Sequence, residues 1–199
     1  MSKTSCDMPG HQPSRGPVFF SKPVDLPGAP PPSPSGRVLY ENLGIRIDRD
    51  GVWYYHGSAI LRKELICLFA GALTRDQSGR YWLVTPAEMG PIDVEDAPFL
   101  AVELFHAGGG ERQKISLRTN VDEIVTIDDV HPLMMVANGA SGERVPYIRL
   151  DKGLEARLTR PVYYELVTLG LEVEIEGRKC LGVWSCGHLF PLGDLDDAL

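Results

Sequence analysis

The 199-residue sequence lacks long hydrophobic runs and has few cysteines. No apolar stretch approaches the roughly 20 residues that a membrane-spanning helix needs, and the N-terminus lacks the apolar region of a secretory signal. The four cysteines do not show the paired short spacing that holds zinc. We therefore expect a cytoplasmic protein with no membrane association, with reduced structural thiols and with no metal site.

The common catalytic and nucleotide-binding motifs are also missing. The sequence contains no Gly-x-x-x-x-Gly-Lys-Ser/Thr, Gly-x-Gly-x-x-Gly, Gly-x-Ser-x-Gly or His-Glu-x-x-His pattern. A hydrolase would need a base and a nucleophile to meet in space, for example His188 with Cys186 or Ser185, but neighbours in a strand point to opposite faces. We predict a protein that is not an enzyme and that uses no cofactor.

Acidic residues outnumber basic residues outside the N-terminal segment. The formal net charge is −7, and residues 1–38 carry four basic and two acidic residues, which leaves −9 for the rest of the chain. An acidic body repels phosphate backbones. We therefore expect no generic nucleic-acid binding.

Proline, by contrast, is abundant at the N-terminus. Residues 1–36 hold nine of the sixteen prolines and little that could form a core. This composition is typical of a solvated, polyproline-type extension. We assign residues 1–38 to a proline-rich disordered tail and predict that removing residues 1–36 leaves folding intact.

Two segments have the apolar spacing of helices. The first is predicted to begin after a cap at Ser58, and its apolar stripe is so wide that we expect the helix to be largely surrounded; the stripe includes Leu61, Leu65, Leu68, Phe69 and Ala72. The second is Thr159–Leu169, with Thr159 as the cap, Pro161 in the first turn and Gly170 as the stop signal.

Most of the remaining segments alternate apolar and polar residues as strands do. We predict strands at residues 45–47, 52–55, 81–84, 92–94, 99–105, 114–119, 123–127, 133–136, 147–150, 154–158, 171–175 and 181–184. The four strands between residues 99 and 136 are separated by turn residues, including the tip Gly108–Gly110, and are predicted to form an antiparallel meander.

The two helical segments suggest an internal duplication. Ser58 matches Thr159, and Glu64-Leu65-Ile66 matches Glu165-Leu166-Val167, at one offset of 101 residues. We predict an α+β fold of two related sub-domains, each a curved antiparallel sheet packed on one main helix, at residues 39–97 and 98–199. The meander would be an insertion in the second. The alternative is two ordinary αβ units that are not related.

Several basic residues lie at predicted strand ends, and on an acidic protein such a local positive charge is informative. In the first turn of a helix a guanidinium lies near the positive end of the helix dipole, which is unfavourable unless an anion is present. We predict that cationic and polar side chains converge on an anion and that aromatic rings stack a base; the candidates are Arg118, Thr119, Asn120, Arg149, Arg160, Tyr163, Tyr164 and Trp82. The alternative is that Arg160 pairs with a surface carboxylate while the tyrosines fill the core.

Several runs of the sequence resemble a known family. They are Asp48–Tyr55, Leu83–Glu88, Val94–Phe99, Arg118–Asn120, Thr159–Leu166 and Leu181–Ser185. Together they resemble the bacterial domain-of-unknown-function family 1285 (DUF1285), over residues 44–193. The resemblance implies a duplicated α+β architecture, a C-terminal half superficially similar to pleckstrin-homology folds, and a nucleotide-like ligand at the domain interface with a role in signal transduction. No activity is established for that family.

Two hypotheses follow. The first is a non-catalytic ligand-sensing protein that binds a small anionic, nucleotide-like molecule in an interdomain groove. The second is a protein-interaction module, with a signalling protein as partner and no small-molecule ligand.

Overall fold

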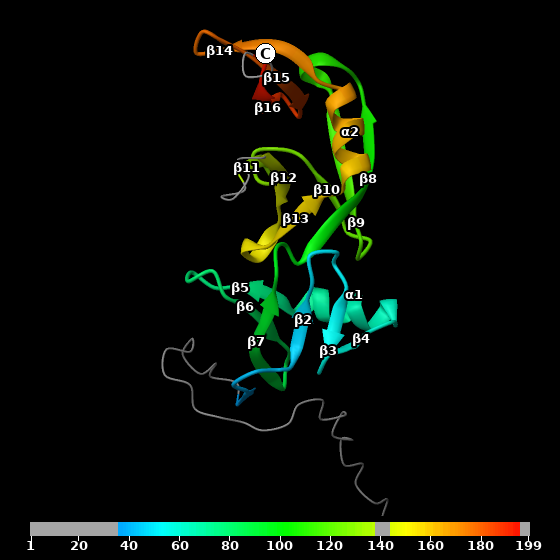
Figure 1. Cartoon of the computed structure of the whole chain (residues 1–199), viewed down its shortest axis with the longest axis vertical. Coiled ribbons are helices and arrows are strands. Elements are labelled where there is room, and N and C mark those ends of the chain that lie inside the picture. Colours follow the sequence, from blue (N-terminus) through cyan, green and yellow to red (C-terminus); the bar gives the residue numbers. More distant parts are fainter. Residues whose placement is uncertain (1–35, 138–143, 196–199) are drawn as a thin grey trace, which may run out of the picture.

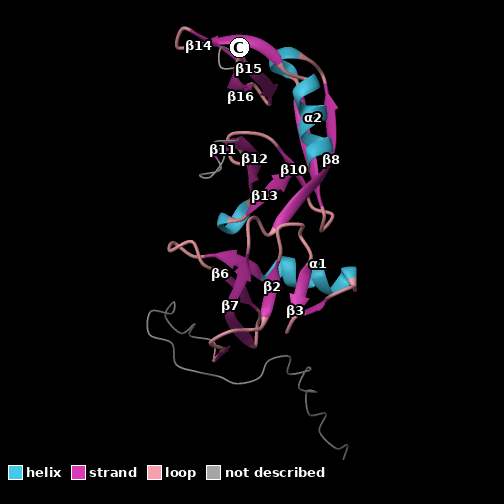
Figure 2. Cartoon of the chain, in the orientation of Figure 1, coloured by secondary structure: helices cyan, strands magenta, loops and turns pink. Residues whose placement is uncertain are grey.

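The computed structural model describes residues 36–137 and 144–195. Three β-sheets follow one another along the long axis, and one helix lies beside the first sheet and another beside the second (Figures 1 and 2). These described residues are mostly β, with two α-helices and several sheets, and so have the α+β character expected. The predicted tail, residues 1–38, lies outside the described ranges as far as residue 35, but Val38 already begins a β-strand and so belongs to the fold. No helix of the described ranges combines the length and apolarity that a bilayer span requires.

The first sheet contains residues 38–94 and has the order β4-β3-β2-β7-β6-β5, with β1 paired to β7. Its strands are β1 (Val38–Leu39), β2 (Ile45–Ile47), β3 (Trp53–Tyr55), β4 (Ser58–Ala59), β5 (Leu73–Arg75), β6 (Tyr81–Val84) and β7 (Glu88–Val94). Both β1 and β2 run parallel to β7. The sheet is therefore mixed, whereas the sequence suggested antiparallel pairing throughout.

The first helix, α1 (Lys63–Ala72), begins later than predicted. Ser58 does not cap it but pairs with Tyr55 in the β3–β4 hairpin, because His56 and Gly57 both have positive φ and close a tight two-residue turn there. The prediction of a largely surrounded helix was also wrong. Leu61 and Leu68 are 90% and 69% exposed, and Phe69 is the buried residue of α1.

The second sheet has the order β10-β9-β8-β13-β12-β11. Its strands are β8 (Phe99–Ala107), β9 (Lys114–Thr119), β10 (Ile124–Thr126), β11 (Leu133–Ala137), β12 (Arg144–Arg149) and β13 (Glu155–Leu158), and short 3₁₀ turns lie at Gly110–Arg112 and Asp151–Gly153. The predicted meander holds for β8, β9 and β10, but β11 pairs with β12 instead of β10. A parallel pairing of β8 with β13 joins the two antiparallel groups.

The second helix, α2 (Arg160–Thr168), lies within the predicted range and contacts β8. Its buried residues are Val162 and Leu166. Thr159 occupies the N-cap position as predicted, but its side chain makes no capping hydrogen bond. Its backbone N–H instead donates to the carbonyl of Ala101, at 3.1 Å, so the helix start is fixed by the sheet.

The third sheet is the antiparallel meander of β14 (Leu171–Ile175), β15 (Arg178–Ser185) and β16 (His188–Asp194). Strand β16 was not predicted. The fully buried Ser185 hydroxyl accepts from the Ile115 N–H at 3.0 Å and donates to the Ile127 carbonyl at 2.6 Å. These hydrogen bonds connect the third sheet to the second, and they give the Ser185 hydroxyl a structural role.

The shared 101-residue offset does not place the two helices in register. The N-cap residues are Arg62 and Thr159, while Glu64 is the second residue of α1 and Glu165 the sixth of α2. Each helix is nonetheless followed by three consecutive antiparallel strands, β5–β7 and β14–β16. One continuous core joins the two halves of the chain.

Candidate functional site

The β2–β3 turn is one of the places where the first sheet contacts the second. The Asp48 carboxylate shapes this turn by accepting the N–H groups of Asp50 and Val52, at 3.0 and 2.9 Å, and the Tyr54 hydroxyl at 2.9 Å. Burial raises the pKa of Asp48, but these hydrogen bonds outweigh it and the net pKa is lowered. The turn is therefore held rigidly, and Arg49 projects from a fixed backbone.

Gly51 makes the close approach possible. Its φ is +74°, and a Cβ atom there would come within 2.9 Å of the Asn120 amide nitrogen and 3.2 Å of Leu100. Asn120 in turn accepts the Leu100 N–H through its side-chain oxygen, at 3.1 Å. Both the backbone conformation and the space require glycine at this point of the domain junction.

A polar pocket of about 260 Å³ opens beside this turn. Residues of both halves of the chain and of the connection between them line it: Arg49, Asp96, Val136, Ala137, Val145, Tyr147 and Arg157. The volume lies just below the range for small-molecule sites, which begins at roughly 300 Å³.

Two hydrogen bonds and an ion pair connect four of the lining residues. The Tyr147 hydroxyl donates to Asp96 Oδ1 at 2.7 Å, and Arg157 Nε lies 3.3 Å from Asp96 Oδ2. Arg157 Nη2 donates to the Arg49 carbonyl at 2.6 Å. Burial, and then the hydrogen bond to Asp96, raise the pKa of Tyr147 well above its ordinary value. Tyr147 therefore remains a neutral hydrogen-bond donor at physiological pH.

The charge of this pocket is net positive. Asp96 balances Arg157, whereas the Arg49 guanidinium is exposed and forms no ion pair with any residue in the described ranges. The Arg49 guanidinium is thus available to a ligand. Guanidinium groups bind carboxylates and phosphates through paired N–H donors, so the pocket can accept a small anion.

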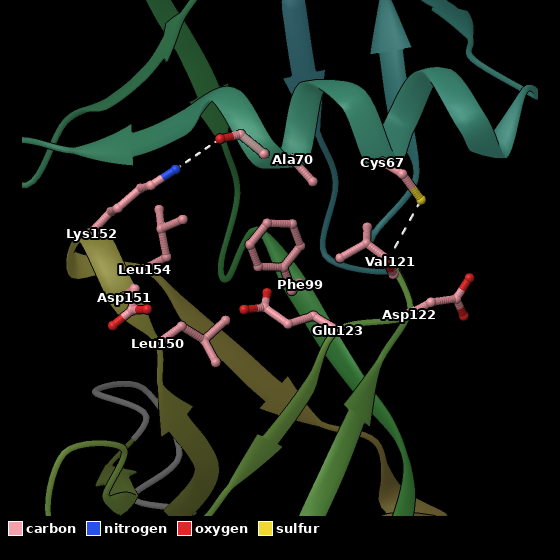
Figure 3. A pocket seen from close by; sticks show the side chains of 11 residues that line it. Cys67, Ala70, Phe99, Val121, Asp122, Glu123, Leu150, Asp151, Lys152 and Leu154 are labelled. Atoms are coloured by element: carbon pink, nitrogen blue, oxygen red, sulfur yellow. Dashed lines mark hydrogen bonds between the residues drawn. The ribbon is translucent and has the colours of Figure 1, made fainter.

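A larger groove of about 420 Å³ lies between α1 and the second sheet (Figure 3). Ion pairs or hydrogen bonds from the second sheet's loops hold α1 along its length: Lys63 Nζ is 2.6 Å from Asp122, Cys67 Sγ is 3.6 Å from the Val121 carbonyl oxygen, and Lys152 Nζ donates to the Gly71 carbonyl at 2.8 Å. Hydrogen bonding from Lys63 lowers the pKa of Asp122 although burial opposes this.

The predicted residues at the end of β9 serve mainly to hold the structure together. Arg118 Nε donates to Glu103 at 2.6 Å, and its Nη1 donates to Asp122 at 3.3 Å. Thr119 is buried, and its hydroxyl accepts the N–H groups of Val121 and Glu123. An anion at Arg118 would have to compete with two carboxylates.

The other predicted residues are spread over the molecule. Trp82 is buried in the first sheet, where its indole N–H donates to Asp76, and Arg149 contacts the Met134 sulfur at 3.6 Å. Arg160 is exposed and has no ion pair among the residues described. Tyr163 and Tyr164 lie beside it in α2 with ring centres 6.3 Å apart. None of the eight predicted residues lines either cavity.

Sequence reasoning did not single out the residues that do line the polar pocket. Arg49 and Asp96 both lie in runs that carry the family resemblance, namely Asp48–Tyr55 and Val94–Phe99. The alternation of β13 also indicates the orientation of Arg157, because this residue lies between the inward-facing Ala156 and Leu158. The missing information was the strand order that brings these segments together.

The comparisons with known proteins support one assignment. Residues 37–97 match the domain described as "Domain of unknown function (DUF1285), N-terminal domain", and residues 98–192 match "Protein of unknown function (DUF1285), C-terminal domain". The comparison with curated proteins gave no match.

Two solved structures are similar to this chain. The crystal structure of a DUF1285 family protein from Silicibacter pomeroyi DSS-3 has 35% identity and a TM-score of 0.74, covering 91% of this chain and 93% of that one. A DUF1285 family protein from Shewanella baltica OS155 has 26% identity and a TM-score of 0.50, covering 63% of this chain and 91% of that one. The chain therefore belongs to the DUF1285 family.

Proposed function

We propose that this protein is a non-catalytic ligand-binding protein that takes a small anionic, nucleotide-like molecule at the domain junction, as a sensor in bacterial signal transduction. The observation that carries the proposal is the polar pocket, where Arg49 is unpaired among the described residues and Arg157 is held in place by Asp96. In this proposal a phosphate contacts Arg49, and the Tyr147 ring contacts a planar base. The sensing role and a pleckstrin-homology-like arrangement of the C-terminal half rest on the family resemblance.

The position of the pocket suits a sensor because both halves of the chain line it. Arg49 comes from the first sheet, Asp96 from the connection, and Tyr147 and Arg157 from the second sheet. A ligand that contacts all of them stabilises one arrangement of the two sheets over others. Binding is thereby coupled to the geometry of the junction without any chemical reaction.

A thermal-shift screen tests the proposal. Nucleoside mono-, di- and triphosphates and cyclic nucleotides are added to the full chain, with free nucleosides as the uncharged comparison. A ligand at 100 times its dissociation constant stabilises by about 2.7 kcal/mol, which corresponds to a rise of roughly 5–10 °C for a chain of this size. We expect the phosphorylated compounds to give a rise and the nucleosides to give none.

Three matched variants locate the site. Arg49→Gln should remove the ligand-induced rise and leave the apo melting temperature within about 1–2 °C of the unsubstituted protein, because its guanidinium makes no ion pair among described residues. Arg80→Gln, another exposed arginine but away from the pocket, should keep the full rise. Loss of the response in Arg160→Gln but not in Arg49→Gln would place the anion at the start of α2 and contradict the proposed pocket.

A protein-interaction module remains the second candidate function, and one observation favours it. Leu61 and Leu68 are largely exposed, although an isolated exposed leucine is common on protein surfaces. A Leu68→Gln variant tests this role. If Leu68 lies in an interface, the substitution will weaken the concentration-dependent association or partner binding of the full chain; unchanged behaviour by light scattering and partner binding would count against the role.

A further inference from the structure

The groove beside α1 differs in chemistry from the polar pocket. Its apolar lining comes from buried side chains of the second half of the chain, Phe99, Leu150 and Leu154, and from Cys67 and Ala70 of α1. Its volume of about 420 Å³ is inside the range of roughly 300–1,000 Å³ that small-molecule sites occupy. The groove can therefore enclose an apolar body such as a single aromatic ring.

The ionisable groups of the groove give it a net negative charge. Three carboxylates, Asp122, Glu123 and Asp151, line it together with one cation, Lys152. Asp122 is engaged by Lys63 and Arg118, at 2.6 and 3.3 Å. Glu123 forms no ion pair with any residue in the described ranges, and Figure 3 shows its side chain pointing into the groove on the side of Phe99. Asp151 lies 3.6 Å from His131 Nε2, so Glu123 is the one carboxylate of the lining with no basic side chain of the described residues at ion-pair distance.

The C-terminal end of α1 also favours a positive charge at this groove. Gly71 is in the last turn of the helix, whose unpaired carbonyls and dipole favour a positive charge, and α1 has no basic residue of its own there. Lys152 supplies one from the second half of the chain by donating to the Gly71 carbonyl at 2.8 Å. Lys152 therefore already satisfies the helix end, and the preference for a positively charged ligand comes from Glu123.

We propose that this groove binds a small molecule with an apolar body and a positively charged nitrogen, such as an arylalkylamine. The apolar body lies against Phe99 and Leu154, and the ammonium group faces Glu123. This site is separate from the anion pocket and selects the opposite charge, so it does not depend on the function proposed above.

Three probes of nearly equal shape test the proposal: 2-phenylethylamine, 3-phenylpropionate and 2-phenylethanol. Each is titrated into the isotopically labelled full chain while backbone amide NMR signals are recorded. We expect 2-phenylethylamine to shift the amides of Cys67, Gly71 and Val121. It should bind about two- to fivefold more tightly than the alcohol, and more tightly still than the carboxylate, because exposed ion pairs contribute factors of this size.

Two charge-neutralising variants locate the selectivity. Glu123→Gln should reduce the affinity for the amine to that for the alcohol, while Glu174→Gln, an exposed glutamate on β14, should leave it unchanged. The same amide spectra test whether both variants are folded. Equal affinity for the three probes, shifts centred outside the groove, or an unchanged amine affinity in Glu123→Gln would each overturn the proposal.

Discussion

Removing the Tyr147 hydroxyl should weaken the domain junction measurably. The Tyr147→Phe substitution deletes the bond that the hydroxyl donates to Asp96 at 2.7 Å and leaves Arg157 as the partner of that carboxylate. A hydrogen bond to a charged group contributes about 1.5–3 kcal/mol when buried, and the half-buried position of Asp96 lowers this figure. We therefore expect the free energy of unfolding to fall by about 1–2 kcal/mol.

Urea unfolding followed by circular dichroism measures this loss, with Tyr164→Phe as the control. Tyr164 is 63% exposed and should change the free energy of unfolding by less than about 0.5 kcal/mol. The pKa of Tyr147 is raised in the folded protein, so its contribution is complete below the ordinary tyrosine pKa and is lost as the pH rises above about 10. The difference between the two proteins should shrink in that range. Equal stability of Tyr147→Phe and the unsubstituted protein at pH 7 would refute the reasoning.

Three further substitutions have clear expected outcomes. Asp76→Ala should lower the melting temperature at pH 7, because the Asp76 carboxylate accepts hydrogen bonds from Ser78 and the Trp82 indole, which hold its pKa at about 2. The difference in melting temperature between the two proteins should disappear as the pH falls from about 4 toward 2, because a carboxylate with a lowered pKa stabilises the fold only above that range. Phe69→Ala should lower the free energy of unfolding by about 3–5 kcal/mol in denaturant titrations, while Leu68→Ala, on the exposed side of α1, should change it by less than about 1 kcal/mol. Thr159→Ala should lower the free energy of unfolding by less than about 0.5 kcal/mol, because the side chain makes no capping bond; a loss near the usual 1 kcal/mol would mean that such a bond forms.

Local pattern was enough to identify most elements of the fold. The ranges Tyr81–Val84, Lys114–Thr119 and Leu171–Ile175 are strands as predicted, and α2 lies within its predicted range. Alternation of side chains with period two and a helix bounded by Pro161 and Gly170 are local signals that need no tertiary information.

The errors arose where pairing partners decided the structure. A tight turn at His56-Gly57 drew Ser58 into a hairpin, although its sequence context favoured a helix cap. The parallel pairing of β8 with β13 joins residues that are far apart in the chain, and no local pattern predicts it. Strand β16 was overlooked because Pro191 and Gly193 lie within it, although Phe190 and Leu192 alternate inward as in other strands.

The candidate site depends even more on tertiary structure. The predicted cations were chosen because they lie at the ends of strands, and this local signal did not reveal that Arg118 is paired with Glu103 and Asp122. Arg49 and Arg157 are 108 residues apart in sequence and meet through one hydrogen bond, which the Arg157 guanidinium donates to the Arg49 carbonyl. Only the packing of the β2–β3 turn on the second sheet brings them to one pocket.

Chemical-shift mapping of the full chain with AMP, GMP, CMP and UMP at millimolar concentration tests the central claim most directly. The polar pocket predicts that at least one nucleotide perturbs the backbone amides of Arg49, Asp96 and Arg157 most strongly, and that the same nucleotide leaves these amides unchanged in Arg49→Gln. Absence of perturbation by all four nucleotides, or perturbations centred on the start of α2, would contradict the assignment of an anion site to the domain junction.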